Sequence, residues 1–311
     1  MSVAVLFPGQ GSQTVGMGAD LFDAHPDLLG ARADDILGWS LREVCLQGPE
    51  ETLTRTEHAQ PALFAISYAL WTEFRSRFEG PIAGAAGHSL GELTALTAAG
   101  ALGYAEGLRV VAARGAAMAG AADLEPSGMA ALIGADEELA AAVVERSKAE
   151  GGNLQVANLN APGQVVVAGA ATDLEWLAAN VRELGVRRAI PLKVAGAFHS
   201  TFMAPAAESV SAALQGVDFE APEFPVWANV TASPHVVGTM AESLRSQVVS
   251  PVRFQASLSD MAAHGIDTFV HVGPGDVTAG MARRTVEGAD VHVISTRADI
   301  PGVVDSLVSI A

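Results

Sequence analysis

The chain opens with a continuous apolar run, VAVLF at residues 3–7, which ends at a Gly-rich segment. A second run, IAGAAG at residues 82–87, consists of small apolar residues and also ends at glycine. Short apolar runs without alternation are typical of strands that are buried on both faces of a parallel sheet. We therefore expect two buried strands, each followed by a tight turn.

Helical spacing of apolar residues dominates the segments between and after these runs. In residues 59–78, one face carries four apolar residues at steps of three and four, namely Leu63, Ile66, Leu70 and Phe74. This spacing predicts a long helix whose first turn contains Pro61, where a missing N–H is tolerated. Further helices are predicted at about 90–99 and 104–119.

The pattern changes near residue 126, where short strands and helices begin to alternate. The predicted order is β-α-β-β-α-β, which is typical of a ferredoxin-like unit. Its elements are strand 128–133, helix 136–148, strand 154–159, strand 164–168, helix 172–184 and strand 187–192. After residue 194 helices dominate again, with strands near 224–228, 266–272 and 290–294.

The expected fold class is therefore α/β, with two domains. Residues 1–125 and 195–311 would form one large α/β-hydrolase-like domain, and residues 126–194 would form an inserted small ferredoxin-like domain. The length of 311 residues suits this division. Half of the residues are hydrophobic, which suits a large core.

The formal net charge of −17, from 18 basic and 35 acidic residues, argues against partners that carry negative charge over a large surface. Nucleic acid and an anionic membrane surface both attract basic proteins, so neither is expected as a partner. The single cysteine, Cys45, excludes an intrachain disulfide and favours a reducing, cytoplasmic location. We expect no targeting or membrane-spanning segment, because no apolar run is long enough to cross a bilayer.

The turn after the second apolar run carries the clearest chemistry. Residues 87–91 read Gly-His-Ser-Leu-Gly, which matches the G-x-S-x-G pattern of a nucleophile elbow between a strand and a helix. The glycines allow the sharp turn that would expose Ser89 Oγ at the N-terminus of the next helix, where backbone amides stabilise developing negative charge. A plain structural turn is the alternative.

A serine nucleophile needs a base, and the chain has eight histidines. His88 adjoins Ser89, so we expect its side chain to point elsewhere and to be structural. His199 lies in a Gly-containing loop, VAGAFHS at 194–200, that could reach the elbow. The residues alone leave His199 open between a base and a structural histidine. The other histidines have no special setting in the sequence: His25, His58, His235, His264, His271 and His292.

Seven motifs in order resemble those of the malonyl-CoA:acyl carrier protein transacylase family and of the acyltransferase domains of polyketide synthases. The resemblance covers nearly the whole chain. The motifs are PGQGSQ at 8–13, GHSLGE at 87–92, the arginine of AARG (Arg114), NLNAPGQ at 158–164, AFHS at 197–200, QVVSPV at 247–252 and GPG at 273–275.

This resemblance implies roles for individual residues. Ser89 would be the nucleophile and His199 the general base, held by the backbone carbonyl of Gln247. The backbone amides of Gln10 and Leu90 would form the oxyanion hole.

The resemblance also implies how the acyl group is bound. Arg114 would grip the free carboxylate of the malonyl group, since a guanidinium binds a carboxylate through two charge-assisted hydrogen bonds. Asn158 and Asn160 would line the cleft between the domains. Phe198 and Leu90 would influence the choice of extender unit, because an aromatic ring in the AFH pattern crowds an α-methyl branch.

The implied reaction uses a coenzyme A thioester as donor and an acyl carrier protein as acceptor, in fatty acid or polyketide synthesis. No metal or redox cofactor is expected. Since carrier proteins are generally acidic, docking would need a local basic patch, either Arg182, Arg187, Arg188 and Lys193 or Arg283 and Arg284. Solvated surface charge is the alternative for both clusters. The sequence leaves the oligomeric state open, and a monomer is one expectation.

Three alternatives remain at this stage. A discrete trans-acting acyltransferase could use another dicarboxylic extender unit. A serine hydrolase of the α/β-hydrolase type would share the elbow, but it normally places an acid between the serine and the histidine in the sequence. A non-catalytic member that binds carriers would not need Ser89, His199 and Arg114 to be intact.

Overall fold

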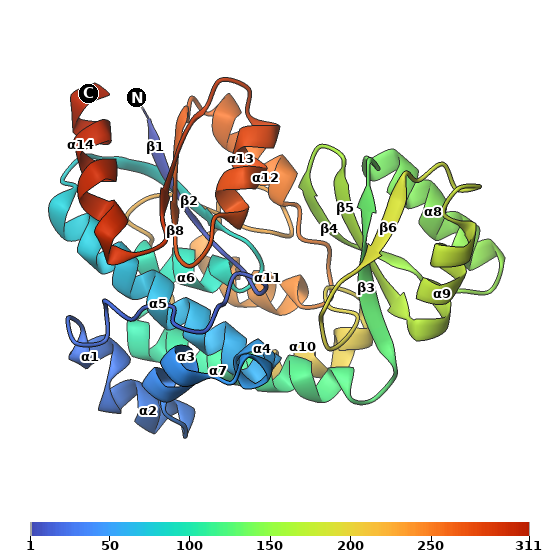
Figure 1. The fold of residues 1–311 in the computed structure, drawn as a ribbon, viewed down its shortest axis with the longest axis horizontal. Helices are drawn as coiled ribbons and strands as arrows, with labels where there is room; N and C mark the ends of the chain where they lie inside the picture. Colours follow the sequence, from blue (N-terminus) through green and yellow to red (C-terminus); the bar gives the residue numbers. More distant parts are fainter. Residues whose placement is uncertain (1, 311) are drawn as a thin grey trace.

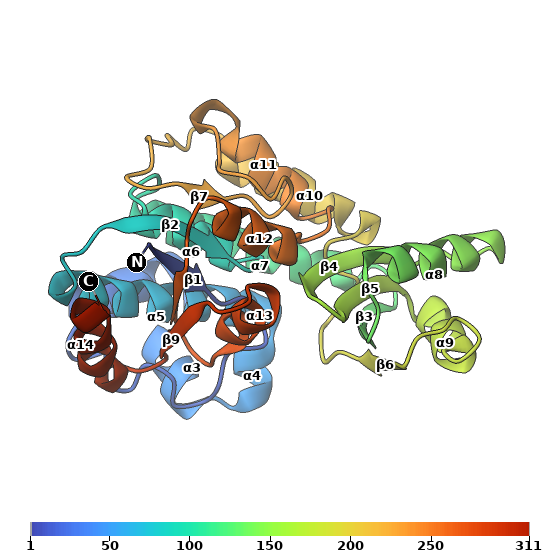
Figure 2. The ribbon, with the colours of Figure 1, turned by 90° about the horizontal axis from the view of Figure 1, so that it is seen from above.

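The computed structural model describes residues 2–310 and shows a large and a small domain (Figure 1). The small domain runs from β3 (Ser127–Ile133) to β6 (Arg188–Pro191), and the large domain uses the chain on both sides of it. From above, the small domain projects from one end of the large one (Figure 2). The expected α/β class with an inserted small domain is therefore confirmed.

A five-stranded parallel sheet forms the centre of the large domain. Its strands are, in spatial order, β7 (Val226–Trp227), β2 (Ile82–Gly87), β1 (Val3–Phe7), β8 (Thr268–Val272) and β9 (Asp290–Ile294). Both predicted apolar runs are central strands, and every residue of β1 is buried. Phe7 at the end of β1 pairs with Gly87 at the end of β2. The loops that follow these two strands therefore leave the sheet side by side.

Helices pack against this sheet, and further helices pack against those. The helices of the large domain are α1 (Pro26–Leu29), α2 (Ala31–Leu37), α3 (Leu41–Gln47), α4 (Glu50–Thr54), α5 (Thr56–Arg77), α6 (Gly91–Ala98), α7 (Tyr104–Ala122), α10 (Ala204–Leu214), α11 (Met240–Gln247), α12 (Phe254–Ala263), α13 (Val277–Thr285) and α14 (Ile300–Ile310), with 3-10 turns at Thr201–Met203, Val237–Thr239 and Arg297–Asp299. The helix predicted at 59–78 begins earlier, at Thr56, so Pro61 lies inside α5 and not in its first turn.

The small domain has the predicted order of elements. Its sheet is antiparallel with the spatial order β4-β5-β3-β6, and its two helices connect β3 to β4 and β5 to β6. The remaining bounds are α8 (Glu137–Ala149), β4 (Gln155–Ala161), β5 (Gln164–Ala170) and α9 (Ala171–Asn180). This topology is that of the ferredoxin-like unit.

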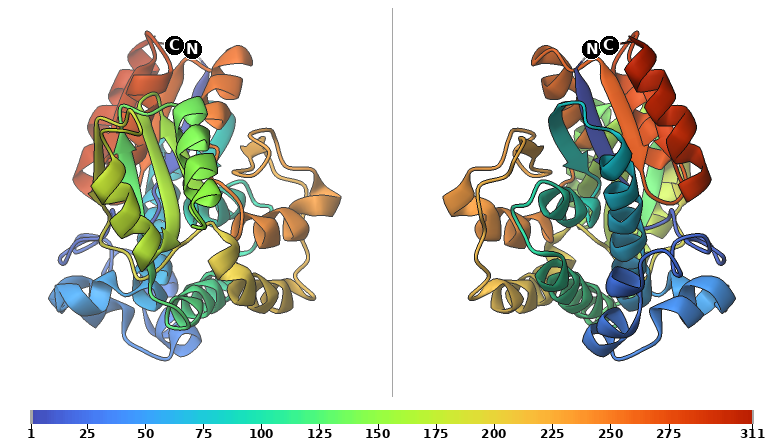
Figure 3. Two further views of the ribbon diagram at one scale, coloured as in Figure 1. Left: turned by 90° about the vertical axis from the view of Figure 1, so that its right-hand side faces the viewer. Right: turned by 90° about the vertical axis from the view of Figure 1, so that its left-hand side faces the viewer.

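Strand β4 joins the two domains. The Leu159 N–H donates to the Val252 carbonyl at 2.8 Å, and the Val252 N–H donates to the Ala157 carbonyl at 2.9 Å. Helix α7, which leads into the small domain, packs beside α10, which follows the return of the chain (Figure 3). The small domain is thus tied to the large one by backbone pairing and by the two connecting segments.

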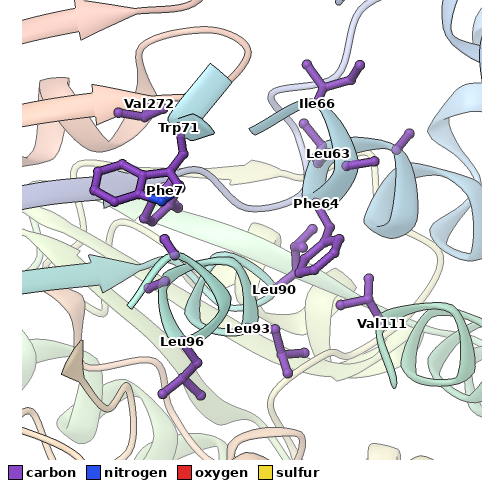
Figure 4. Close-up of a cluster of buried hydrophobic side chains, with 14 of the residues drawn as sticks. Phe7, Leu63, Phe64, Ile66, Trp71, Leu90, Leu93, Leu96, Val111 and Val272 are labelled. Carbon is purple, nitrogen blue, oxygen red and sulfur yellow. The ribbon is translucent and has the colours of Figure 1, made fainter. Parts of the chain in front are cut away.

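The main hydrophobic core lies between the large sheet and the helices that follow β1 and β2. Phe7 and Trp71 pack edge to face, and Leu63, Phe64 and Leu90 extend the same cluster (Figure 4). Burial of these side chains fixes α5 and α6 against the carboxyl ends of the central strands. Among residues 2–310, no helix is long and apolar enough to cross a membrane.

Candidate active site

Ser89 lies at the turn between β2 and α6 and has a φ of 53°, in the left-handed region that non-glycine residues rarely adopt. The flanking glycines make this turn possible. A Cβ on Gly87 would lie 1.9 Å from the carbonyl carbon of Gly91, and a Cβ on Gly91 would lie 2.5 Å from the carbonyl oxygen of Phe7. The turn therefore has the geometry of a nucleophile elbow.

His199 reaches Ser89 from the loop that follows the small domain. Its Nε2 lies 2.8 Å from Ser89 Oγ, although 110 residues separate the two in the chain. Its Nδ1 lies 2.8 Å from the backbone carbonyl of Gln247, which can only accept, so Nδ1 carries the proton. This tautomer leaves the lone pair of Nε2 facing the serine hydroxyl, as a general base requires.

The protonation of His199 is set by its surroundings. Burial, and next the nearby charge of Arg114, lower the pKa of His199 to about 3, against the opposing effect of the Gln247 carbonyl. Both causes disfavour the imidazolium ion. The ring is therefore neutral at physiological pH and able to accept a proton.

Arg114 projects from α7 into the same site and is almost fully buried. Its Nη2 donates to Ser89 Oγ at 3.0 Å and to Gln247 Oε1 at 2.8 Å, while its Nη1 donates to Gln60 Oε1 at 2.6 Å. Burial lowers the pKa of this guanidinium to about 10, and the charge of Glu92 acts in the opposite direction. Arg114 is therefore a buried cation at neutral pH.

Every hydrogen bond of this guanidinium within residues 2–310 goes to a neutral oxygen. Its Nε is buried and has no partner among these residues. A carboxylate would form stronger, charge-assisted bonds than these neutral acceptors. Sequence reasoning missed Gln60 and the side chain of Gln247, because neither lies near Arg114 in the chain.

Two backbone amides at the site are available as donors. Within residues 2–310, the N–H groups of Gln10 and Leu90 have no hydrogen-bond acceptor. The neighbouring N–H of Ser89 is occupied, because it donates to Asn229 Oδ1 at 2.8 Å. Leu90 immediately precedes α6, so its amide belongs to the positive end of that helix. The two free amides could stabilise an oxyanion.

A cavity of about 180 Å³ opens onto Ser89 between the domains. Asn158 and Asn160 of β4 line it, as expected, together with Phe198 and Met118. Such a cavity, apolar with a few convergent polar groups, is typical of a small-molecule site.

The two residues expected to govern extender choice are placed differently. Phe198 is almost fully buried and lines the cavity. The Leu90 side chain instead packs in the core near Phe64 and does not line the cavity (Figure 4). Leu90 was expected to influence extender choice, whereas the start of α6 directs its side chain into the interior, away from the cavity. Only the Leu90 amide faces the site chemistry.

Two further histidines have partners that the sequence did not identify. His88 has the structural role that was expected, because its Nε2 lies 2.7 Å from Asn160 Oδ1, which joins the two domains. His235 was given no special setting, yet its Nε2 lies 2.7 Å from Oε1 of the buried Glu92. Neither partnership has a local sequence signal, since the partners are 72 and 143 residues apart. Residues 2–310 contain no cluster of side chains that could hold a metal ion.

Comparisons with known proteins agree on one family. The family model described as "Acyl transferase domain" matches residues 5–302. A malonyl CoA-acyl carrier protein transacylase of Bacillus subtilis is 40% identical over 285 residues, which cover 91% of this chain and 90% of that protein. The polyketide biosynthesis protein ThaF of Burkholderia thailandensis is 38% identical over 281 residues, which cover 90% of this chain and 24% of that protein.

The fold is also similar to solved structures. One is a malonyl-transacylase in complex with the acyl-carrier protein of a type II polyketide synthase. It superposes with a TM-score of 0.92 at 33% identity, and the match covers 98% of this chain and 100% of that chain.

Proposed function

This chain belongs to the acyl transferase domain family, and we propose that it moves a malonyl group from malonyl-CoA to the phosphopantetheine thiol of an acyl carrier protein. The similar proteins include a malonyl CoA-acyl carrier protein transacylase and a polyketide biosynthesis protein, and the proposal covers both fatty acid and polyketide synthesis. One observation carries the proposal: Ser89 Oγ lies within hydrogen-bond distance of both a neutral imidazole and a buried guanidinium.

In the first half-reaction, His199 Nε2 takes the proton of Ser89 Oγ while the oxygen attacks the thioester carbonyl of malonyl-CoA. The amides of Gln10 and Leu90 stabilise the oxyanion of the tetrahedral intermediate. The carbon–sulfur bond then breaks, and the departing sulfur takes the proton from His199. The products are free coenzyme A and a malonyl ester on Ser89.

In the second half-reaction, the phosphopantetheine thiol of the carrier loses its proton to His199 and attacks the ester carbonyl. The same two amides stabilise the second oxyanion, and Ser89 Oγ regains a proton as it leaves. Every proton transfer has a side chain to perform it, so the proposed cycle needs no metal or redox cofactor. Ping-pong kinetics follow from the covalent intermediate.

Arg114 selects acyl groups that end in a carboxylate. The guanidinium already lies at the nucleophile and is bound only by neutral oxygens among the described residues. A malonyl carboxylate adds a charge-assisted pair, whereas an acetyl group offers no partner to this buried cation. A discrete acyltransferase that uses another dicarboxylic extender unit remains the second candidate, because the same pair forms with any such unit.

The carrier protein docks at the mouth of the cavity. Exposed Arg187, Arg188 and Lys193 lie in or beside β6, in the same stretch of chain as Leu192, which lines the cavity and is itself exposed. On the opposite domain, exposed Arg284 donates to Gln164, another lining residue, at 3.3 Å. These basic side chains are suited to an acidic carrier, even though the whole chain carries a net charge of −17.

An assay with a panel of acyl-CoA donors tests the proposal. Acetyl-, malonyl-, methylmalonyl- and ethylmalonyl-CoA are incubated with the enzyme, with and without holo carrier protein, and the products are read by mass. We expect malonyl-carrier as the main product and slow release of free malonate without a carrier. A serine hydrolase would release malonate at its full rate without any carrier, and that result would overturn the proposal.

A further inference from the structure

Glu92 is a fully buried carboxylate in the first turn of α6, three residues after the nucleophile. Its Oε2 accepts hydrogen bonds from the Asn229 N–H at 3.0 Å and from Gln247 Nε2 at 2.7 Å. Its Oε1 lies 2.7 Å from Nε2 of His235, whose side chain is only 1% exposed. A buried carboxyl group is tolerated only when its oxygens have hydrogen-bond partners, and both oxygens of Glu92 meet this condition.

The two residues that donate to Glu92 Oε2, Asn229 and Gln247, both bind the backbone of the elbow. Asn229 is fully buried, and its side chain bridges the turn, because Oδ1 accepts from the Ser89 N–H at 2.8 Å and Nδ2 donates to the Gly87 carbonyl at 2.7 Å. Gln247 Nε2 donates to the Ser89 carbonyl at 2.8 Å. The main-chain N–H and C=O of Ser89 are thus both bound by side chains of residues that Glu92 holds, Asn229 through its backbone N–H and Gln247 through its side chain.

The elbow needs this support because its backbone is strained. A φ of 53° at a serine persists only where the surrounding structure imposes it. The bond from Asn229 also occupies the Ser89 amide, which leaves the following amide, that of Leu90, as the free donor toward the reacting carbonyl. Small errors in this orientation would misplace both the hydroxyl and the oxyanion donor.

We propose that Glu92 is a positioning residue, which holds the strained backbone of Ser89 through Asn229 and Gln247. Its role differs from that of the acid in a hydrolase triad, because the Nδ1 of His199 is bound by a backbone carbonyl and not by this carboxylate. The inference rests on the proposed function, since it assigns a role in acyl transfer at the same serine.

Three substitutions test this role. Glu92→Leu removes both acceptor oxygens. Glu92→Gln keeps one acceptor oxygen, which can accept from Asn229 and Gln247. Its amide nitrogen replaces the other oxygen and can donate to His235 when that ring carries its proton on Nδ1. Asp173→Leu is the matched control, because Asp173 is a buried residue of the small domain that accepts from the backbone N–H groups of Asn153 and Ala170, neither of which belongs to the elbow.

The measured quantity is the single-turnover rate of malonyl-Ser89 formation at saturating malonyl-CoA, with the half-saturating concentration and the melting temperature beside it. We expect Glu92→Leu to lower this rate by about 100-fold, since small misplacements of reacting groups have effects of this size. The half-saturating concentration should stay within about threefold of that of the unsubstituted protein. Glu92→Gln should restore the rate to within about tenfold, and the Asp173 control should keep it.

Specific outcomes overturn the inference. These are an unchanged rate in folded Glu92→Leu, a rate in Glu92→Gln as low as in Glu92→Leu, or an equal loss in the Asp173 control. If Glu92→Leu does not fold, Asn229→Ala is the substitute. It removes both side-chain bonds to the elbow, while the backbone N–H of residue 229 still donates to Glu92. An unchanged rate of malonyl-Ser89 formation in Asn229→Ala also overturns the inference. A missing Ser89 adduct in the unsubstituted protein would instead contradict the proposed function.

Discussion

The Nη2 atom of Arg114 lies 3.0 Å from Ser89 Oγ, so the cation that would recognise the substrate touches the nucleophile before any substrate is present. The same oxygen lies 2.8 Å from His199 Nε2. A malonyl carboxylate that attracts the guanidinium would weaken its bond to the serine and partly neutralise the charge that depresses the basicity of the imidazole. Substrate selection and nucleophile activation are therefore linked through one side chain.

The first prediction concerns substitution of this arginine. Arg114→Ala should lower kcat/KM for malonyl-CoA by roughly 100-fold or more, because each hydrogen bond to a charged group contributes about 1.5–3 kcal/mol. Acetyl transfer should change by less than about tenfold. Arg114→Lys should not restore malonyl transfer, since an ammonium cannot reproduce the two parallel bonds of a guanidinium.

Arg109 supplies the control for this experiment. It is exposed on the same helix, α7, and precedes Arg114 by little more than one helical turn. Arg109→Ala should leave the malonyl-to-acetyl ratio unchanged. Equal losses for malonyl and acetyl in Arg114→Ala would show that the arginine supports the fold and does not read the carboxylate.

The second prediction concerns pH. Only neutral His199 acts as a base, so activity is present above its pKa and is lost as the pH falls through that value. With a pKa of about 3 in the free enzyme, lowered first by burial and then by Arg114, labelling of Ser89 by a neutral sulfonyl fluoride should show no acid limb between pH 5 and 7. For malonyl transfer the acid limb should lie at higher pH, because the bound carboxylate offsets the charge of Arg114.

Rates of labelling and of malonyl transfer, measured over the same buffers, check this prediction. In Arg114→Met the acid limb of labelling should move upward, since one of the two causes of the low pKa is gone. A limb near the ordinary histidine value of 6.5 in the unsubstituted free enzyme would contradict the account.

The third prediction concerns extender choice. Phe198 is buried and lines the cavity, so Phe198→Ala should make room for an α-methyl branch. The ratio of methylmalonyl to malonyl transfer, measured by competition, should rise by about tenfold or more, which is the discrimination that one methyl group can supply. Phe202→Ala is the control, because Phe202 lies in the same segment but outside this cavity, and it should leave the ratio unchanged.

The fourth prediction concerns the carrier. Arg187→Glu and Arg188→Glu should each raise KM for the holo carrier several-fold, and they should flatten its dependence on salt, while hydrolysis of malonyl-CoA without a carrier stays constant. Arg32→Glu, an exposed residue of α2, gives the same change in charge and should have little effect. An unchanged KM and salt dependence in both patch variants would remove this docking surface.

Local patterns in the sequence predicted most of the fold. The strand–turn–helix around Ser89 follows from an apolar run, two obligatory glycines and a helix start, all within a short stretch of sequence. The ferredoxin-like unit was predicted from its alternation of short strands and helices. The start of α5 and the placement of Pro61 were misjudged, because the three residues of that helix before the predicted start, 56–58, carry no strong apolar periodicity and only packing defines where it begins.

The site was harder to predict from the sequence, because its contacts join distant segments. His199 meets Ser89 only after the whole small domain has been inserted between them, so the residues alone could not decide its role. Glu92 and Asn229 are 137 residues apart, and neither has a local pattern that signals the other. The direction of the Leu90 side chain could not be predicted either, because the direction of a residue at a helix start depends on the packing of that helix.

The central claim is that Ser89 becomes the acyl carrier of the reaction. A rapid-quench experiment with stoichiometric malonyl-CoA, followed by intact mass and peptide mapping, tests it most directly. The account predicts one malonyl group per chain, located on the peptide that contains Ser89, absent in Ser89→Ala, and removed when holo carrier protein is added. Release of coenzyme A without such an adduct, or an adduct on another residue, would contradict it.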